Sequence, residues 1–135
     1  MLQLLSHLRF MNLFYHHAHN VVSRVPFFAD HEALGSFYTE ADKDYDDVIE
    51  RMIGKDMQAP LVQIMSGVQP KLSLMPQEGA ENKQYFVVAM QLEKDLRSLI
   101  DQEIAKGVSE GTRQLLGNIA DKSEMRTYKL KQRVK

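Results

Sequence analysis

The feature that most constrains this chain's fold is a helical spacing of apolar and aromatic residues in two neighbouring segments. In the first segment these residues recur at alternating intervals of four and three, at Leu4, Leu8, Met11, Tyr15, Ala18 and Val22. The second segment repeats the rhythm at Leu34, Tyr38, Ala41, Tyr45, Val48 and Met52 and stops near Gly54. Such spacing gathers side chains on one helix face. Between the segments, Pro26 disfavours helix at Val25 and favours a new helix start, so a helical hairpin is predicted.

Two more helices are predicted in the second half of the chain. One spans about Glu81 to Lys106, with an apolar side formed by Tyr85, Ala89, Leu92, Leu96 and Leu99. The last spans about Glu110 to Leu130, with apolar anchors at Leu115, Leu116, Ile119 and Met125. Prolines and glycines interrupt the stretch from Gly54 to Gly79, where a short helix over APLVQIM is expected. Two short connections around one long crossover predict an all-α chain, a ferritin-like four-helix bundle.

Length and composition are those of one ordinary globular domain covering residues 1–135. Hydrophobic residues make up 44% of the chain, charged residues 26%, and the net charge is -1, which gives no global reason to bind nucleic acid or membrane. There is no cysteine, so any metal would need histidine and carboxylate ligands. His7, Arg9 and Asn12 interrupt the apolar N-terminal stretch, so we expect no signal peptide or membrane span and a soluble, cytoplasmic protein.

Four metal-capable side chains stand at informative positions: His19, His31, Asp46 and Glu50. His31 and Asp46 fall on one predicted helix and lie about 22 Å apart along its axis, too far for both to bind one ion. An antiparallel two-fold pairing of these helices would bring Asp46 and Glu50 of one subunit to the two histidines of the other. Iron, zinc and manganese all suit such a mixture of nitrogen and oxygen ligands.

The stretch from His19 to Gly54 resembles the Dps proteins, the dodecameric mini-ferritins of bacteria. The resemblance lies in FF-x-x-HE at Phe27 to Glu32, in Phe37-Tyr38, and in Asp-x-x-x-Glu-Arg at Asp46 to Arg51. The later sequence GTRQLLGNIADKSEMRTYKL is more weakly similar to the last helix of that family. Similarity thus extends over nearly the whole chain, and its specificity is concentrated in the first of these stretches.

The resemblance implies a ferroxidase that stores iron in a hollow shell of identical subunits. Ferrous iron would bind between two subunits and be oxidised by peroxide or dioxygen. By the same analogy, His19 and His31 come from one subunit and Asp46 and Glu50 from its partner. The chain departs from the family at Gly35, where a carboxylate is usual, and at Asn20, where a tryptophan is usual. Either Asp30 or Glu32 is a candidate substitute for the missing carboxylate.

Structural interpretations compete with each of these functional ones. His16, next to His17 in the run HHAH, is expected to face solvent or an interface. A solvated helix face explains the acidic residues Asp42, Asp44, Asp46 and Asp47, and core filling explains Met11, Met52, Met90 and Met125. The C-terminal basic residues are Lys122, Arg126, Lys129, Lys131, Arg133 and Lys135. In the structural interpretation their positive charges complement the dipole at the C-terminus of the last helix. In the functional interpretation they bind the phosphates of DNA.

Three functions therefore stay open after the sequence alone. The first is a Dps-like ferroxidase with an intersubunit metal site. The second is a ferritin-like structural or interaction oligomer, including one encoded by a phage, in which Gly35 marks a decayed site. The third, with the weakest support, is a DNA-binding protector that acts through the basic C-terminal segment.

Overall fold

The computed structural model describes residues 1–135 and contains helices but no strand. The helices are α1 (Leu2–Val21), α2 (Phe27–Gly54), α3 (Leu61–Val68), the 3-10 helix η1 (Gln69–Leu74), α4 (Asn82–Ala105) and α5 (Glu110–Val134). The all-α prediction is confirmed, and each predicted helix is present. The last helix runs one turn beyond its predicted end at Leu130. In the crossover, the expected short helix is α3, and η1 continues it.

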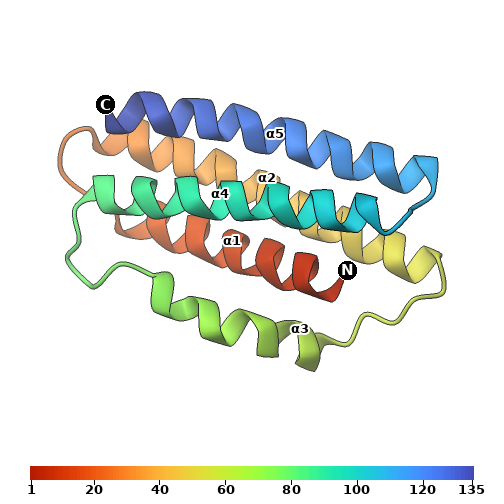
Figure 1. Ribbon diagram of the computed structural model, residues 1–135. Helices are drawn as coiled ribbons and strands as arrows, with labels where there is room; N and C mark the ends of the chain where they lie inside the picture. Colours follow the sequence, from red (N-terminus) through yellow and green to blue (C-terminus); the bar gives the residue numbers. More distant parts are fainter.

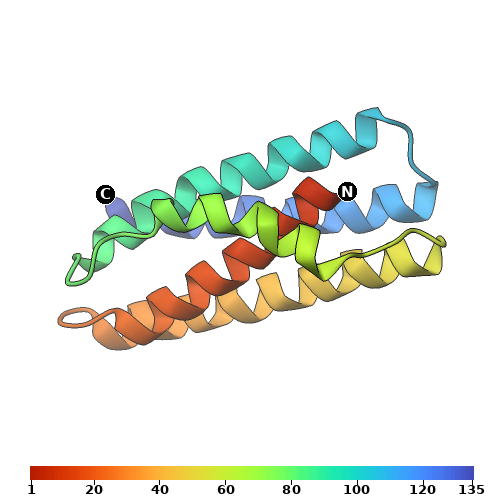
Figure 2. The same cartoon turned by 90° about the horizontal axis from the view of Figure 1, so that it is seen from below.

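The four long helices lie side by side as a bundle (Figures 1 and 2). Helices α1 and α2 form one antiparallel hairpin, and α4 and α5 form the other. Across the bundle, α1 contacts α4 and α2 contacts α5, again antiparallel. The segment after α2 returns along the outside of α1, where α3 packs. This return brings the chain back to the end of the bundle at which α2 began, so α4 runs parallel to α2.

Local signals explain where the second hairpin begins and turns. The Glu81 side chain accepts a hydrogen bond from the backbone N–H of Gln84, and the Gln84 side chain accepts one from the Glu81 N–H, which forms a capping box at the start of α4. Gly107 ends the α4 region with φ at 86°, a left-handed conformation that glycine adopts without steric cost. Ser109 then caps α5 by accepting a hydrogen bond from the Thr112 N–H.

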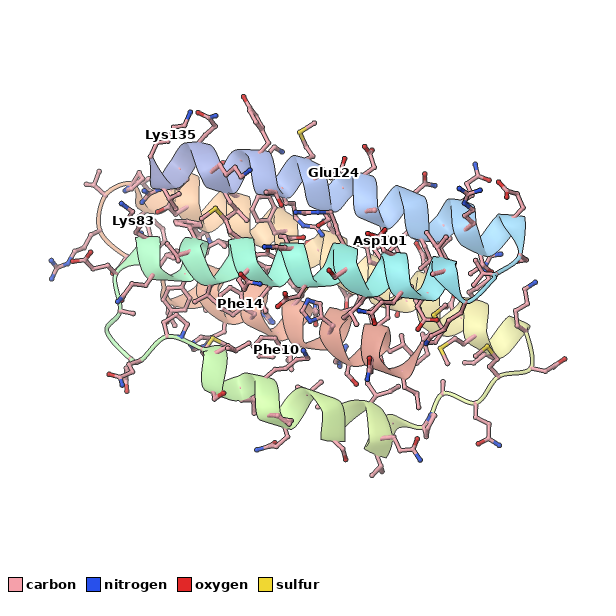
Figure 3. All side chains as sticks on the ribbon, in the orientation of Figure 1. Phe10, Phe14, Lys83, Asp101, Glu124 and Lys135 are labelled. Carbon is pink, nitrogen blue, oxygen red and sulfur yellow. The ribbon has the colours of Figure 1, made fainter.

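A single cluster of 26 buried apolar residues fills the space between the helices. It includes every member of the predicted stripe on α1 and, except for the half-buried Tyr38, every member of the stripe on α2. Phe10 and Phe14 point from α1 into the bundle, whereas Lys83, Glu124 and Lys135 extend from its outer surface (Figure 3). Burial of side chains of this size contributes about 1.5 to 3 kcal/mol each, so this cluster stabilises the bundle.

The prediction for α5 was wrong at Met125. Its side chain is 56% exposed, so it is neither an apolar anchor nor a core-filling methionine, while the neighbouring Arg126 is 1% exposed. The buried face of α5 is formed by Thr112, Leu116, Ile119, Ser123, Arg126 and Leu130. This face has the same spacing of fours and threes as α1, but half of its positions are polar. None of the helices combines the length and apolarity that a membrane span needs.

Candidate functional site

The two predicted histidine ligands lie together where α1 ends and α2 begins. The imidazole rings of His19 and His31 are stacked, with centroids 3.7 Å apart and planes inclined by 21°. Nδ1 of His19 lies 2.7 Å from the backbone oxygen of His31, and Nδ1 of His31 lies 2.8 Å from the backbone oxygen of His19. A carbonyl oxygen only accepts, so each Nδ1 carries a proton, and in the neutral ring each Nε2 then carries the free lone pair.

Both Nε2 atoms are available to a ligand. The buried side-chain atoms without a hydrogen-bond partner are elsewhere, at His7 Nδ1, Arg9 Nε and Asp44 Oδ2. Neither Nε2 of the stacked pair accepts a hydrogen bond within the chain, and both imidazoles are only half-buried. Metal-binding histidines usually donate their other ring N–H to a carbonyl or carboxylate, which fixes the ring orientation. The pair therefore has the tautomer and the second hydrogen bond that a metal ligand needs.

The ring of His19 occupies the space beside Gly35. A Cβ atom placed on Gly35 would lie 3.0 Å from both Cε1 and Nδ1 of His19, closer than ordinary van der Waals contact. A side chain at this position would require the ring to shift by a few tenths of an ångström. The absence of a side chain at Gly35 thus leaves room for the His19 ring in its stacked position, and the additional carboxylate that the resemblance implies at position 35 would crowd this ring.

Aromatic rings hold the imidazole pair on both sides. Phe27 stacks on His31 with centroids 5.0 Å apart, and Tyr38 lies 6.2 Å from His19. Tyr38 also stacks on His16, with centroids 4.3 Å apart and the planes inclined by 8°. His16 is exposed, as expected, but its ring is held by this contact. These contacts restrict the rotation of the two imidazoles, so the pair is organised before any ligand binds.

The two predicted carboxylate ligands lie away from the histidines. Asp46 and Glu50 are exposed on the outer face of α2, and neither forms an ion pair within the chain. No group of three or more metal-capable side chains lies together in a single copy. His31 and Asp46 are separated along α2 by about 22 Å. One chain thus carries two candidate half-sites, a pair of imidazoles near one end of α2 and a pair of carboxylates near the other.

Two nearby acids have structural roles instead. Asp30 is 2% exposed and accepts two hydrogen bonds of 2.9 Å from the guanidinium of Arg133, so it cannot substitute for the missing ligand at position 35. Asp44 is fully buried and paired with Lys122, so its assignment to a solvated acidic face was wrong. Burial raises the pKa of Asp44, although the Lys122 ammonium lowers it in part. Glu32 remains exposed on α2.

Sequence reasoning missed a buried polar network in the middle of the bundle. The Glu93 carboxylate is fully buried and accepts hydrogen bonds from Arg126 Nε and Nη2, at 2.7 and 3.0 Å. It also accepts one from Ser123 Oγ, at 2.8 Å, and one from the Tyr15 hydroxyl. The third nitrogen of Arg126 donates to Glu40 at 2.8 Å. Burial, with help from the Glu93 charge, raises the pKa of Tyr15 well above its ordinary value, so the phenol stays protonated.

Comparison with known proteins does not assign the chain to a family. No family model matches its sequence, and no curated protein matches it significantly. The candidate half-sites and the residue pattern described above are therefore the features of the chain that bear on its function.

Five of the six basic C-terminal residues lie on helix α5 and Lys135 follows it, and half of the six are paired. Lys122 pairs with Asp44, Arg126 with Glu93 and Glu40, and Arg133 with Asp30. The remaining three, Lys129, Lys131 and Lys135, are exposed. Fewer charges are therefore free to contact phosphates than the sequence count indicates.

Proposed function

We propose that this chain is a Dps-like protein that binds ferrous iron between two subunits and oxidises it with peroxide or dioxygen. The observation that carries the proposal is the His19–His31 pair, whose hydrogen bonds leave both Nε2 lone pairs free. Asp46 and Glu50, one turn apart on the same exposed helix face, supply the carboxylates from the partner subunit. Two neutral imidazoles and two carboxylates would neutralise the charge of one divalent ion.

The proposal includes an assembly. Antiparallel two-fold dimers would build two identical sites, and such dimers would form a shell, by resemblance a dodecamer, that holds the ferric product in the cytoplasm. In this proposal the bundle is a ferritin-like fold. Its antiparallel hairpins and its long crossover along α1 support that assignment. Iron is the substrate, and zinc and manganese fit the same ligand types.

The test compares iron oxidation by four purified proteins at equal concentration. The wild type should accelerate the formation of ferric iron over a protein-free control, and His31→Ala and Asp46→Ala should each abolish the acceleration. Glu124→Ala, which removes an exposed carboxylate from α5, is the control and should behave as the wild type. Calorimetric titration with zinc supplies a reading that does not depend on oxidation. A wild type that matches the protein-free control contradicts the ferroxidase.

A second candidate function is a ferritin-like structural oligomer that binds no metal, including one encoded by a phage. Gly35 favours this candidate, because the resemblance implies a carboxylate at that position. This candidate predicts an ordered assembly that contains no metal by elemental analysis and binds no added zinc. Binding of DNA through α5 has the least support, because three of the six basic side chains are engaged in ion pairs. If DNA does bind, its retardation in a gel should disappear at high salt.

A further inference from the structure

A cavity of about 290 Å³ opens at the end of the bundle where α2 stops and the chain turns from α4 into α5 (Figure 1). Its lining has an apolar part and a basic part. The apolar part includes Met52, Met57 and Val108, and the basic part is formed by Arg51, Lys55 and Lys106. Sites for small molecules usually enclose about 300–1,000 Å³, so this cavity has room for a small ion or a small molecule.

Two of the three basic side chains, Arg51 and Lys55, form no ion pair within the chain. Asp47, the acid one turn before Arg51, pairs with Lys43 instead. The Arg51 guanidinium is half-buried and lies against the first turn of α5, since a Cβ atom placed on Gly111 would lie 3.1 Å from its Nη1. The N-terminal end of a helix carries a partial positive charge. This positive pole therefore lies beside a guanidinium that no carboxylate of the chain balances.

A buried hydroxyl adds a hydrogen-bond donor to the cavity. Thr112 lines the cavity and is 6% exposed. Its Oγ1 accepts a hydrogen bond of 3.0 Å from Ser109 Oγ, which itself accepts one from the Thr112 N–H. The hydroxyl proton of Thr112 is left without an acceptor in the chain. A hydroxyl can donate one hydrogen bond while it accepts others, so an anion in the cavity would satisfy this proton.

From the cavity, the unpaired cations and the unused donor, we propose that this site binds a phosphate group, as inorganic phosphate or as a small phosphate monoester. A phosphate monoester carries about 1.5 to 2 negative charges at neutral pH, which matches the two unpaired cations. Its oxygens accept hydrogen bonds from the Arg51 guanidinium, the Lys55 ammonium and the Thr112 hydroxyl. A carboxylate, with one charge, would balance only one of the two cations.

A neighbouring hollow on α2 is lined by the same two cations but does not suit an anion. Asp47 and Glu50 also line it, and their charges repel a phosphate. The only acid in the lining of the cavity beside the α4–α5 turn is Glu103, which is paired with Lys106 at 3.1 Å. Phosphate is therefore expected on that side. The proposal is independent of the metal half-sites, because neither of them lines this cavity.

Isothermal titration calorimetry with inorganic phosphate tests the site in the whole chain. The wild type should bind phosphate saturably, with a Kd below about 1 mM. Arg51→Gln removes the guanidinium charge and should weaken binding at least about tenfold. Thr112→Val removes the hydroxyl at nearly constant volume and should weaken binding about threefold. The matched control is Arg113→Gln, which removes an exposed, unpaired guanidinium of α5 outside the cavity and should bind as the wild type.

Titration with glycerol phosphate separates the two sources of the phosphate group. Tighter binding than that of inorganic phosphate assigns the apolar part of the cavity to the body of a monoester, and equal or weaker binding assigns the cavity to phosphate itself. Absence of saturable binding of either ligand to the wild type overturns the proposal, as does an equal loss in Arg51→Gln and Arg113→Gln. If Arg51→Gln changes the mass of the assembly in sedimentation but keeps the wild-type affinity for phosphate, Arg51 pairs with a carboxylate of a second copy, and the proposal is wrong.

Discussion

His19 and His31 each donate a hydrogen bond from Nδ1 to the backbone carbonyl of the other, across the turn that joins α1 to α2. The two bonds connect side chain to backbone in both directions, so neither ring can turn without losing a bond to a half-buried carbonyl. They also lock the same tautomer in both rings. This relationship gives the hairpin a fixed pair of nitrogen donors, which is the arrangement that supports a metal site at this end of the bundle.

Replacing Gly35 with Asp should weaken metal binding although it restores a carboxylate. The new Cβ would lie 3.0 Å from Nδ1 and Cε1 of His19, so the ring must shift by a few tenths of an ångström and its hydrogen bond to the His31 carbonyl should weaken. We expect Gly35→Asp to lose the protected Nδ1–H resonances of His19 and His31 in NMR spectra and to bind zinc at least tenfold more weakly than the wild type.

The control for this change is Gly117→Ala on α5, where a Cβ meets no atom within 4 Å. It should leave the histidine resonances unchanged and stabilise the chain by up to about 1 kcal/mol, the difference in helix propensity between glycine and alanine. If Gly35→Asp binds zinc more tightly than the wild type with both Nδ1–H resonances intact, the steric argument is wrong.

Arg126→Met should be strongly destabilising. It leaves the Glu93 carboxylate buried without its guanidinium, and breaking a buried ion pair in this way costs about 3–5 kcal/mol. The double variant Glu93→Leu/Arg126→Met removes both charges and should recover much of the loss. Urea unfolding of the wild type, Arg126→Met, Glu93→Leu and the double variant gives the coupling energy between the two residues.

An exposed ion pair provides the comparison. Lys43 pairs with Asp47 on the surface of α2, and its side chain is 68% exposed, so Lys43→Met should leave the free energy of unfolding nearly unchanged. A similarly small loss in Arg126→Met would mean that the buried network does not stabilise the bundle.

The sequence was sufficient for the helices but not for the polar core. On α1 and α2 the buried positions are apolar, so their spacing predicted both helices and the hairpin. On α5 the buried positions have the same spacing but include Ser123 and Arg126. A prediction based on apolar residues alone therefore placed Met125 in the core instead of Arg126. Glu93 and Arg126 come from different helices, and each is acceptable in the core only because the other is there. No local pattern contains that information.

The site was predictable to a similar extent. The length of one helix predicted that Asp46 and His31 lie too far apart to bind one ion, and in the structure they lie near opposite ends of α2. The reciprocal hydrogen bonds of the imidazole pair were not predictable, because they depend on how the turn brings two backbone carbonyls beside two rings. Gly35 carried a sequence signal, but only the position of the His19 ring explains it.

Met125→Lys should be nearly neutral. The Met125 side chain projects from the outer side of α5, and surface substitutions of this kind usually change stability by no more than about 0.5 kcal/mol. Leu116→Ala on the buried side of the same helix should cost about 2–5 kcal/mol. Thermal unfolding of both variants checks which face of α5 packs, and a large loss in Met125→Lys would contradict the orientation of this helix.

His7 should make the bundle sensitive to mild acid. Its ring is fully buried on α1, Nε2 lies 2.8 Å from the backbone oxygen of Leu92, and Nδ1 has no partner. Burial lowers the pKa of His7, and Lys71 adds to this effect, whereas the Leu92 hydrogen bond and the charges of Asp95 and Glu93 oppose it. Below about pH 6.5 the unfolded chain therefore takes up a proton that the folded chain does not, and stability falls as the pH falls.

The variant His7→Gln removes this titration and keeps a group that can donate to the Leu92 carbonyl. Between pH 7.5 and pH 5, the wild type should lose more unfolding free energy than His7→Gln at the same protein concentration, as measured by urea unfolding. His17→Gln changes an exposed histidine of the same helix and should follow the wild type. If the unfolding free energies of wild type and His7→Gln fall in parallel as the pH falls, protonation of His7 is not the cause of the sensitivity to acid.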